Sequence, residues 1–358
     1  MQDQVRRSPH VSASSGLGLV QEGSLRMAPL LRVPSLLAEF GLDAGTIITE
    51  AGLAPSLFGD PENIIAFADL GRLLALCAER SRCPHFGHLV GDQAGLDVLG
   101  LIGQLARQAP DVGAALNSVI LYLHLHDRGA VPALWLCEDR VVVAYTVYQP
   151  EIPGIEQIYD AALAITYNVI QALCVPGFEA IEVRLSRPRP ADVEPYRRFY
   201  RARMRFDAER TAVVFTANWL RHPLDGADAL LHQQLLQMIA FLDAQGTDDL
   251  VGHLRRVLRR ILIQGAAPGD TSLAHIARLF ALHRRTLNRR LRALGTSFKA
   301  LIEEARYDVA RQLLRDTSLP ITDVAASLEY ADAAAFTRAF KRWSGVSPGT
   351  WRTSLPSA

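Results

Sequence analysis

Cysteine is scarce in this sequence, and long apolar runs are absent from it. The four cysteines form no CxxC pair and show no regular spacing: they are Cys77, Cys83, Cys137 and Cys174. This pattern fits neither a disulfide framework nor a zinc site, so we interpret them as free thiols in a reducing compartment. No apolar stretch reaches the length of about 18 residues that crosses a bilayer. No continuous apolar segment follows Arg6 and Arg7, as a signal peptide would require. We therefore expect a cytoplasmic protein that does not bind membranes.

Motifs of common enzyme classes are missing as well. The sequence contains no GxSxG, no HExxH and no phosphate-binding glycine loop. Cys83, His85 and His88 are metal-ligand residue types, but their spacing is loose. His124 and His126 fall where a helix is expected to end, a place where histidine suits the helix dipole. We therefore predict a protein that is not an enzyme and has no catalytic residues, no metal and no cofactor.

Charge is nearly balanced over the 358 residues, at +1, but it is distributed unevenly. From Asp248 to the end, 18 lysines and arginines stand against 10 acidic residues, which gives +8. Residues 1–247 contain 20 basic and 27 acidic residues, which gives −7. An acidic body followed by a basic C-terminal third is typical of a protein with a nucleic-acid-binding module.

The acidic part of the chain mixes helical and strand patterns. Residues 1–24 are rich in serine, glycine and glutamine and lack periodicity, so we predict a disordered tail. Residues 25–245 are predicted to form an α+β sensor or dimerisation domain, because the patterns do not alternate as in βαβ folds. The expected helices cover residues 33–40, 112–123, 155–172 and 193–201, and the expected strands cover residues 131–137, 141–150, 180–186 and 211–216.

The two strands around Glu138-Asp139-Arg140 form a predicted hairpin with apolar residues on both faces. Such a hairpin is either covered on both sides or lines a pocket. Its large aromatic residues, Trp135, Tyr145 and Tyr148, are therefore our candidates for binding a small-molecule effector.

Residues 246–358 show no convincing strand pattern and contain a weak internal repeat. HIARLFALHRRTLNRRL and DVAASLEYADAAAFTRAF superimpose with one inserted residue. Each copy has the pattern of a short helix, a tight turn and a second helix, as in a helix-turn-helix. The copies end alike, in Gly295-Thr296-Ser297 and Gly345-Val346-Ser347. The matched apolar pairs are Ile276 and Val324, Ala277 and Ala325, Phe280 and Leu328, Leu282 and Tyr330, Leu287 and Phe336, and Leu291 and Phe340.

The second helix of the first copy contains HRRTLNRRLR, with five arginines and one narrow apolar stripe. Taken alone, such a run is most often a solvated face. Here the repeat and the basic charge favour DNA contact instead. Arginine can bind guanine, and asparagine adenine, through paired hydrogen bonds in the major groove. Residues on the face opposite the apolar stripe are predicted to contact bases: Arg285, Asn288, Arg289 and Arg292. Arg284 and Arg290, off that face, are predicted to contact phosphates.

Residues 250–352 resemble the DNA-binding domain of the AraC/XylS-type bacterial transcription regulators. AFTRAFKRWSGVSP resembles the C-terminal signature of that family, and TLNRRLRALGTSFKALIEEARYDVARQLL resembles its first recognition helix and linker helix. HFGHLVG and PLDGADALL resemble, less strongly, the arabinose-binding-like sensor domain of one branch. The resemblance implies an all-α domain with two helix-turn-helix motifs joined by a long helix, from about Ser297 to Arg315. It places DNA recognition at Arg285, Asn288 and Arg289 in the first copy and at Ala333, Ala334, Thr337 and Arg338 in the second.

Two positions depart from the family pattern. Glu329 stands where the family usually has glycine, and a non-glycine residue held at positive φ costs on the order of 1 kcal/mol. His283 stands where the family usually has a serine N-cap, and it is a weaker cap. Both changes predict a slightly less stable DNA-binding domain.

The second copy differs from the first in its chemistry. Its leading positions are alanines, which offer only apolar contact, for instance with a thymine methyl group. We therefore predict that the first copy recognises most of the sequence and that the second positions the protein through Arg338 and Lys341. Phe336, Phe340 and Trp343 could stack on bases, but their i, i+4, i+7 spacing favours core packing.

We therefore expect a sequence-specific transcription regulator, with double-stranded DNA as its partner. Activation is the commoner mode in the resembled family, so RNA polymerase is an expected partner. A small-molecule effector and a homodimer are expected through the N-terminal domain. The alternative is an N-terminal domain that serves only as an oligomerisation or protein-interaction scaffold.

Overall fold

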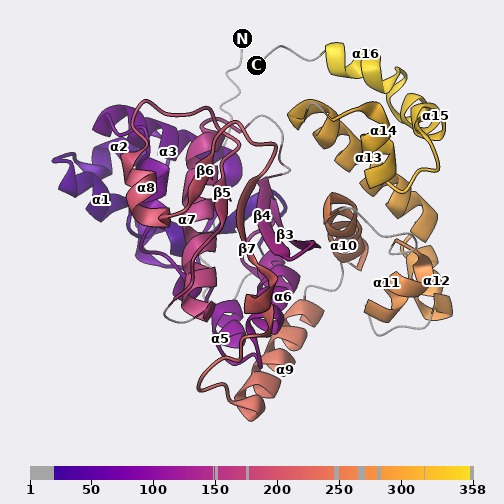
Figure 1. Ribbon diagram of the computed structural model, residues 1–358, viewed down its shortest axis with the longest axis horizontal. Coiled ribbons are helices and arrows are strands. Elements are labelled where there is room, and N and C mark those ends of the chain that lie inside the picture. The colour runs from indigo at the N-terminus through magenta and orange to yellow at the C-terminus, as the bar shows by residue number, and fades with distance from the viewer. Residues whose placement is uncertain are drawn as a thin grey trace, which may run out of the picture.

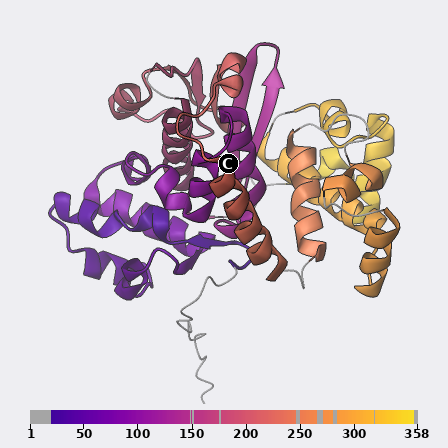
Figure 2. The ribbon, with the colours of Figure 1, turned by 90° about the horizontal axis from the view of Figure 1, so that it is seen from below.

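The computed structural model describes residues 20–147, 149, 152–174, 177–245, 250–264, 271–279, 284–317 and 319–354. All strands of this described part lie before residue 217. From residue 250 onward the described residues form helices and turns, which lie to one side of the strand-containing body in Figure 1 and Figure 2. The predicted fold class, an α+β domain followed by an all-α domain with two helix-turn-helix motifs, is confirmed.

A five-stranded sheet forms the centre of the N-terminal body, in the order β3-β4-β7-β5-β6. Its pairs are antiparallel except β5 and β6, which run parallel. Pro132 on β3 is paired with Tyr145 on β4, so these two residues share one face of the sheet. A separate two-stranded sheet joins β1 and β2. The strands are β1 Ser24–Arg26, β2 Ile64–Ala66, β3 Ala130–Cys137, β4 Arg140–Val147, β5 Glu182–Arg184, β6 Arg203–Arg205 and β7 Thr211–Thr216.

Helices pack around this sheet in two adjoining hydrophobic cores. The helices of this body are α1 Val33–Glu39, α2 Ala44–Glu50, α3 Phe67–Ser81, α4 Phe86–Gly91, α5 Leu101–Arg107, α6 Val112–Tyr122, α7 Ile155–Cys174, α8 Glu194–Tyr200 and α9 Ala229–Gln245. Short 3₁₀ turns are η1 Ala28–Leu30, η2 Pro55–Gly59, η3 Leu96–Leu99, η4 Leu123–Leu125 and η5 Ala217–Arg221. Among the described helices, none combines the length and the apolar character that a membrane span requires.

The HFGHLVG stretch contains α4, which crosses α7 at close range. A Cβ atom on Gly87 would lie 2.1 Å from the carbonyl oxygen of Gln157, and one on Gly91 would lie 2.3 Å from that of Ala161. No side chain fits at either place, so the two glycines allow the backbones to touch. The Gln157 side chain also joins the two helices, because it accepts a hydrogen bond from the Gly87 N–H at 2.8 Å.

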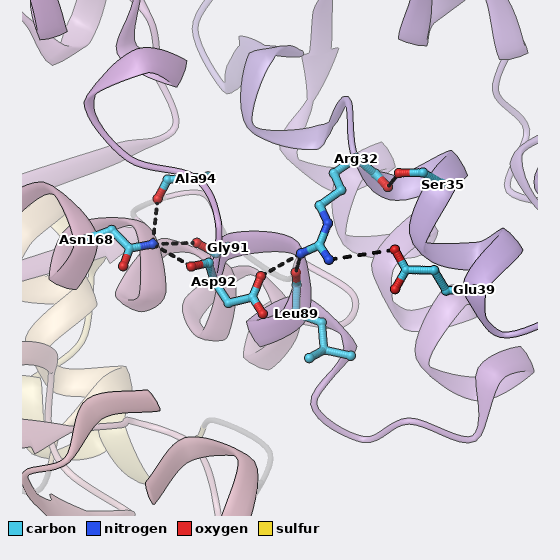
Figure 3. Close-up of polar contacts among 8 residues, drawn as sticks. All are labelled: Arg32, Ser35, Glu39, Leu89, Gly91, Asp92, Ala94 and Asn168. Atoms are coloured by element: carbon cyan, nitrogen blue, oxygen red, sulfur yellow. Dashed lines mark hydrogen bonds and ion pairs between the residues drawn. The ribbon is translucent and has the colours of Figure 1, made fainter. Parts of the chain in front are cut away.

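Polar contacts fix the C-terminal end of α4 (Figure 3). The side-chain amide of Asn168 on α7 donates to carbonyl oxygens at the end of α4, including those of Asp92 and Ala94 at 2.8 Å. Arg32, just before α1, donates to the Asp92 carboxylate at 2.6 Å and to the Leu89 carbonyl at 2.8 Å. These bonds satisfy orphan carbonyls at a helix C-terminus and tie α1, α4 and α7 together.

The C-terminal body contains helices α10 Leu250–Gln264, α11 Leu273–Leu279, α12 Arg284–Ala293, α13 Phe298–Asp316, α14 Ile321–Ser327, α15 Ala333–Ser344 and α16 Pro348–Thr353. The fully buried leucines of α10 follow an i, i+4, i+8 stripe: Leu254, Leu258 and Leu262. They share one core with the later helices and with Val131 of β3. Helix α10 thus lies between the sheet and the remaining C-terminal helices (Figure 1).

The predicted helices and strands are all present, with shifted ends. The predicted linker helix begins at Phe298 and ends at Asp316, one residue from each expected end. Strands β1, β2 and β6 and helices α2 to α5 and α9 were not predicted. Most of the predicted tail, residues 1–24, lies outside the described residues; within it, Val20 is buried and Ser24 pairs with Ala66. The predicted domain boundary adjoins residues 246–249, which are also outside the described part.

Candidate functional site

The internal repeat corresponds to two helix pairs, α11 with α12 and α14 with α15. Where both residues of a matched apolar pair are described, both are at most 1% exposed. These residues are Ile276, Ala277, Leu287, Leu291, Val324, Ala325, Phe336 and Phe340. Phe280 and Leu282 lie outside the described residues, and so does His283. The sequence repeat is therefore a repeat of core positions.

The two copies also end in the same way. Gly295 follows α12 at φ 73°, and Gly345 follows α15 at φ 80°, the left-handed conformation that glycine adopts without strain. Two residues later, Ser297 accepts a hydrogen bond from the N–H of Ala300 and starts α13. Ser347 does the same for α16 through the N–H of Thr350.

Helix α12 presents one basic face to solvent. Leu287 and Leu291 are fully buried, and the arginines at the other positions are exposed: they are Arg284, Arg285, Arg289, Arg290 and Arg292. Asn288 is half-buried. Within the described part of the chain, no carboxylate forms an ion pair with Arg284, Arg289, Arg290 or Arg292. The helix therefore carries a concentrated positive charge on its solvent-exposed side.

Helix α15 presents a face of different composition. Asp332 caps the helix by accepting from the N–H of Ala335 at 2.6 Å. Ala334 is exposed and Ala333 is half-buried. The hydroxyl group of Thr337 donates to the Ala333 carbonyl at 2.7 Å, so its proton is already used inside the helix. Arg338 and Lys341 are exposed on the same helix.

The aromatic residues of α15 belong to the core, as their spacing predicted. Phe336 and Phe340 are fully buried. The ring of Tyr307 on α13 lies 5.7 Å from that of Phe340 and 5.5 Å from that of Trp343. Contacts of this kind attach α15 firmly to the linker helix.

Glu329 adopts the positive φ that a glycine would, at 57°. Its carboxylate lies 3.2 Å from the guanidinium of Arg306 on α13 and accepts a hydrogen bond from the hydroxyl group of Thr271. Arg306 also lies over the ring of Tyr330, at 5.1 Å. The side chain of Glu329 thus links the second turn to the linker helix and to the segment before α11, contacts that glycine could not make.

The N-terminal body contains a partly open cavity of about 110 Å³. Its walls come from β1, η1, α3, α6, β3, β4 and α7. Of the 24 lining residues, four carry polar side chains: His126, Asp127, Tyr145 and Thr166. The interior is therefore apolar, with polar groups concentrated where η4 leads into β3.

Two of these polar groups, Asp127 and Tyr145, are hydrogen-bonded to each other. Asp127 accepts hydrogen bonds from the Tyr145 hydroxyl at 2.5 Å and from the N–H groups of Gly129 and Ala130 at 2.9 and 3.1 Å. Burial raises the pKa of Asp127 to about 6, although these hydrogen bonds act to lower it. Burial lowers the pKa of His126 to about 3, with a smaller contribution from Arg26, so the imidazole is neutral. Nε2 of His126 has no partner among the described residues.

Two of the three aromatic candidates, Tyr145 and Trp135, lie on opposite faces of the sheet. Tyr145 lines the cavity. Trp135 packs on the other face of the sheet, against Val142 and Val214, with the guanidinium of Arg210 5.4 Å from its ring centre. Tyr148 lies outside the described residues.

The histidines considered as metal ligands lie in two different places. His88 is buried against the rings of Tyr196 and Phe199, both 4.9 Å away, and burial lowers its pKa to about 4. His126 lines the cavity, a role that the sequence analysis missed. The available signal was a histidine and an aspartate side by side after an apolar helix. No cluster of three metal-ligand side chains occurs among the residues described here.

The cavity and the C-terminal body meet at strand β3. Pro132 lines the cavity, whereas the adjacent Val131 points to the opposite face and packs with Leu254 and Leu258 of α10. Near this contact, Arg259 of α10 forms an ion pair with Asp308 of α13.

Two family models match the chain, one on each body. The arabinose-binding domain of AraC transcription regulators matches residues 41–224, and a helix-turn-helix domain matches residues 276–354. The ornithine utilization regulator of Pseudomonas aeruginosa is 26% identical over 326 residues, covering 88% of this chain and 93% of the relative. The transcriptional regulator VirS of Mycobacterium tuberculosis is 27% identical over 341 residues, covering 92% and 97%. The crystal structure of the regulator CdpR of P. aeruginosa aligns over 87% of this chain and 96% of its own, with 24% identity and a TM-score of 0.44.

The repeated helix-turn-helix frame, the two family models and the two relatives define a DNA-binding transcription regulator. The chain belongs to the AraC family, with an arabinose-binding-like N-terminal domain, as the sequence resemblance predicted.

Proposed function

We propose that this protein recognises its operator mainly through the first helix-turn-helix, while the second positions it on the DNA. The exposed face of α12 carries this proposal. Arg285, Asn288 and Arg289 lie opposite the buried Leu287 and Leu291, where they can reach the base edges of a major groove. Arg292 extends this face by a turn, and Arg284 and Arg290 flank it, where they can reach phosphates.

Helix α15 offers fewer groups for base recognition. Ala333 and Ala334 provide methyl groups only, and the hydroxyl proton of Thr337 is engaged with the backbone. Arg338 and Lys341 are exposed cations that suit phosphates. The two recognition helices would enter successive major grooves about 34 Å apart on one face of the DNA.

Titration of operator variants tests this division. Arg285→Ala should remove about 1–3 kcal/mol of discrimination at one base position. Arg290→Ala should weaken binding to all sequences alike and reduce the slope of log affinity against log salt concentration by about 1. Arg198→Ala is the matched control, because it removes one exposed positive charge from α8, far from α12. Uniform weakening by Arg285→Ala would contradict base recognition by that residue.

We also propose that a small-molecule effector binds in the cavity and alters DNA binding through β3, with activation through RNA polymerase as the outcome. The support is that neighbouring residues of β3 point to opposite faces of the sheet: Pro132 lines the cavity and Val131 packs on α10. A ligand that displaces β3 would therefore change how the C-terminal body packs against this strand. Regulation that stays unchanged under every condition after deletion of residues 1–245 would refute an effector role.

A second candidate role for the N-terminal domain is homodimerisation, and helix α9 favours it. Leu230, Met238 and Phe241 fall on one side of that helix and are 64%, 52% and 63% exposed. Sedimentation velocity of Phe241→Ser against the wild type tests dimerisation. A melting-temperature screen of the full chain against metabolites separates the roles, since an effector raises stability and a pure scaffold gives no hit.

A further inference from the structure

The chemistry of the cavity restricts what can bind there, given the proposed effector role on which this inference rests. Twenty of the 24 lining residues are apolar, and none is lysine or arginine. The one ionisable acid is Asp127, which is 4% exposed. An anionic ligand would therefore meet a carboxylate and no cation.

The nearest cation outside the lining already has partners. Arg26 is buried, and its guanidinium donates to the Glu62 carboxylate at 2.6 Å and to the Leu125 carbonyl at 3.1 Å. Its charge is thus balanced by Glu62 rather than directed to the cavity.

The polar end can accept hydrogen bonds from a ligand. The Asp127 carboxylate accepts three hydrogen bonds from the protein, and a carboxylate offers about four acceptor positions. One position therefore remains. The neutral imidazole of His126, 5% exposed, lies in the same wall and has an unpartnered ring nitrogen.

The volume sets the size of the ligand part that this partly open cavity can bury. An apolar protein cavity of about 150 Å³ holds a molecule of benzene size. The cavity here, at about 110 Å³, suits a similarly small body.

We infer that the cavity binds a small apolar molecule of about six to eight non-hydrogen atoms that carries one hydrogen-bond-donating head group, an alcohol or an amine, and no anionic group. Its head group lies against His126 and Asp127, and its apolar body lies between α6 and α7. Compounds with a carboxylate or phosphate bind more weakly, because Asp127 repels them.

Three compounds with one hydrocarbon body test this inference: hexan-1-ol, hexylamine and hexanoate. Their binding to the full-length protein is measured by calorimetry at millimolar concentrations and pH 7.5. Hexan-1-ol and hexylamine should bind, and hexanoate should bind at least about tenfold more weakly. Hexanoate binding as tight as hexan-1-ol, or no binding of either donor compound, would overturn the inference.

Asp127→Asn tests the stated cause. The variant should reduce the difference between hexan-1-ol and hexanoate, and hexylamine should lose more affinity than hexan-1-ol. Asp139→Asn, at the exposed turn on the far end of the same hairpin, should leave all three affinities unchanged. If the affinity ratio of hexan-1-ol to hexanoate is the same in Asp127→Asn as in the wild type, the role of the carboxylate is overturned. The wild-type comparison remains decisive even if Asp127→Asn does not fold.

Operator binding measured with the same compounds separates this inference from the proposed function. Compounds that bind in the predicted order but leave operator affinity unchanged at saturation would support the ligand class and refute the effector role.

Discussion

Replacing Glu329 with glycine should destabilise the DNA-binding domain, although glycine suits the local backbone better. Glu329 has φ 57°, and relieving that strain should contribute about 1 kcal/mol. The substitution also removes the charge-assisted hydrogen bond to Arg306, at 3.2 Å, which is worth about 1.5–3 kcal/mol. It removes the bond to Thr271 as well, and the flexibility of glycine in the unfolded chain opposes folding by up to about 1 kcal/mol. The net expectation is a loss of about 1–3 kcal/mol.

Glu138 provides a matched control for this substitution. It is the same residue type with the same φ of 57°, but it is exposed at the β3–β4 turn. Glu138→Gly should therefore combine the same strain relief with the same glycine flexibility, without the loss of buried contacts, and leave stability within about 1 kcal/mol of the wild type. Urea unfolding measures both changes, and hydrogen exchange in α14 and α15 assigns the first to the C-terminal body. If Glu329→Gly proves as stabilising as Glu138→Gly, the compensating role of the carboxylate is refuted.

Two further predictions concern the N-terminal body. Gly87→Ala should lower stability by about 3 kcal/mol or more, because its methyl group would lie 2.1 Å from the Gln157 carbonyl oxygen; an unchanged melting temperature would show that α4 and α7 can separate freely. Acid should destabilise the protein through His126, whose pKa falls from 6.5 to about 3 on folding. Between these two pH values the unfolded chain binds a proton on His126 and the folded chain does not. The free energy of unfolding should therefore fall by about 1.4 kcal/mol for each pH unit from pH 6.5 to pH 3. His126→Phe should lose correspondingly less stability between pH 6.5 and 5, and an identical pH dependence in the two proteins would disprove the buried neutral state.

Local patterns in the sequence were sufficient to predict much of the C-terminal body. The periodicity that placed Leu287 and Leu291 beneath α12 depends only on residues within one helix. The repeat adds a second, independent copy of the same arrangement, in which Phe336 and Phe340 are buried. Glycine at positive φ after each recognition helix is also a local requirement. These features follow from sequence because each involves neighbours along the chain.

The cavity could not be predicted in this way. Its wall joins residues as distant as Leu25, Tyr145 and Val169, each of which has the pattern of an ordinary core residue. Only the strand order of the sheet and the packing of α7 bring them together. Strand β6 escaped prediction for a different reason, because a strand of three residues carries almost no periodic signal, and its parallel pairing with β5 could not be predicted without it.

Selection of binding sites from random DNA tests the central claim most directly, that α12 recognises the operator and α15 mainly positions the protein. The selection is carried out with the wild type, with Arg285→Ala and with Ala334→Ser. We expect Arg285→Ala to erase preference at one or more positions in one half of the site, and Ala334→Ser to leave the selected sequence essentially unchanged. Loss of preference confined to Ala334→Ser, with the Arg285→Ala protein selecting the wild-type sequence, would contradict the account.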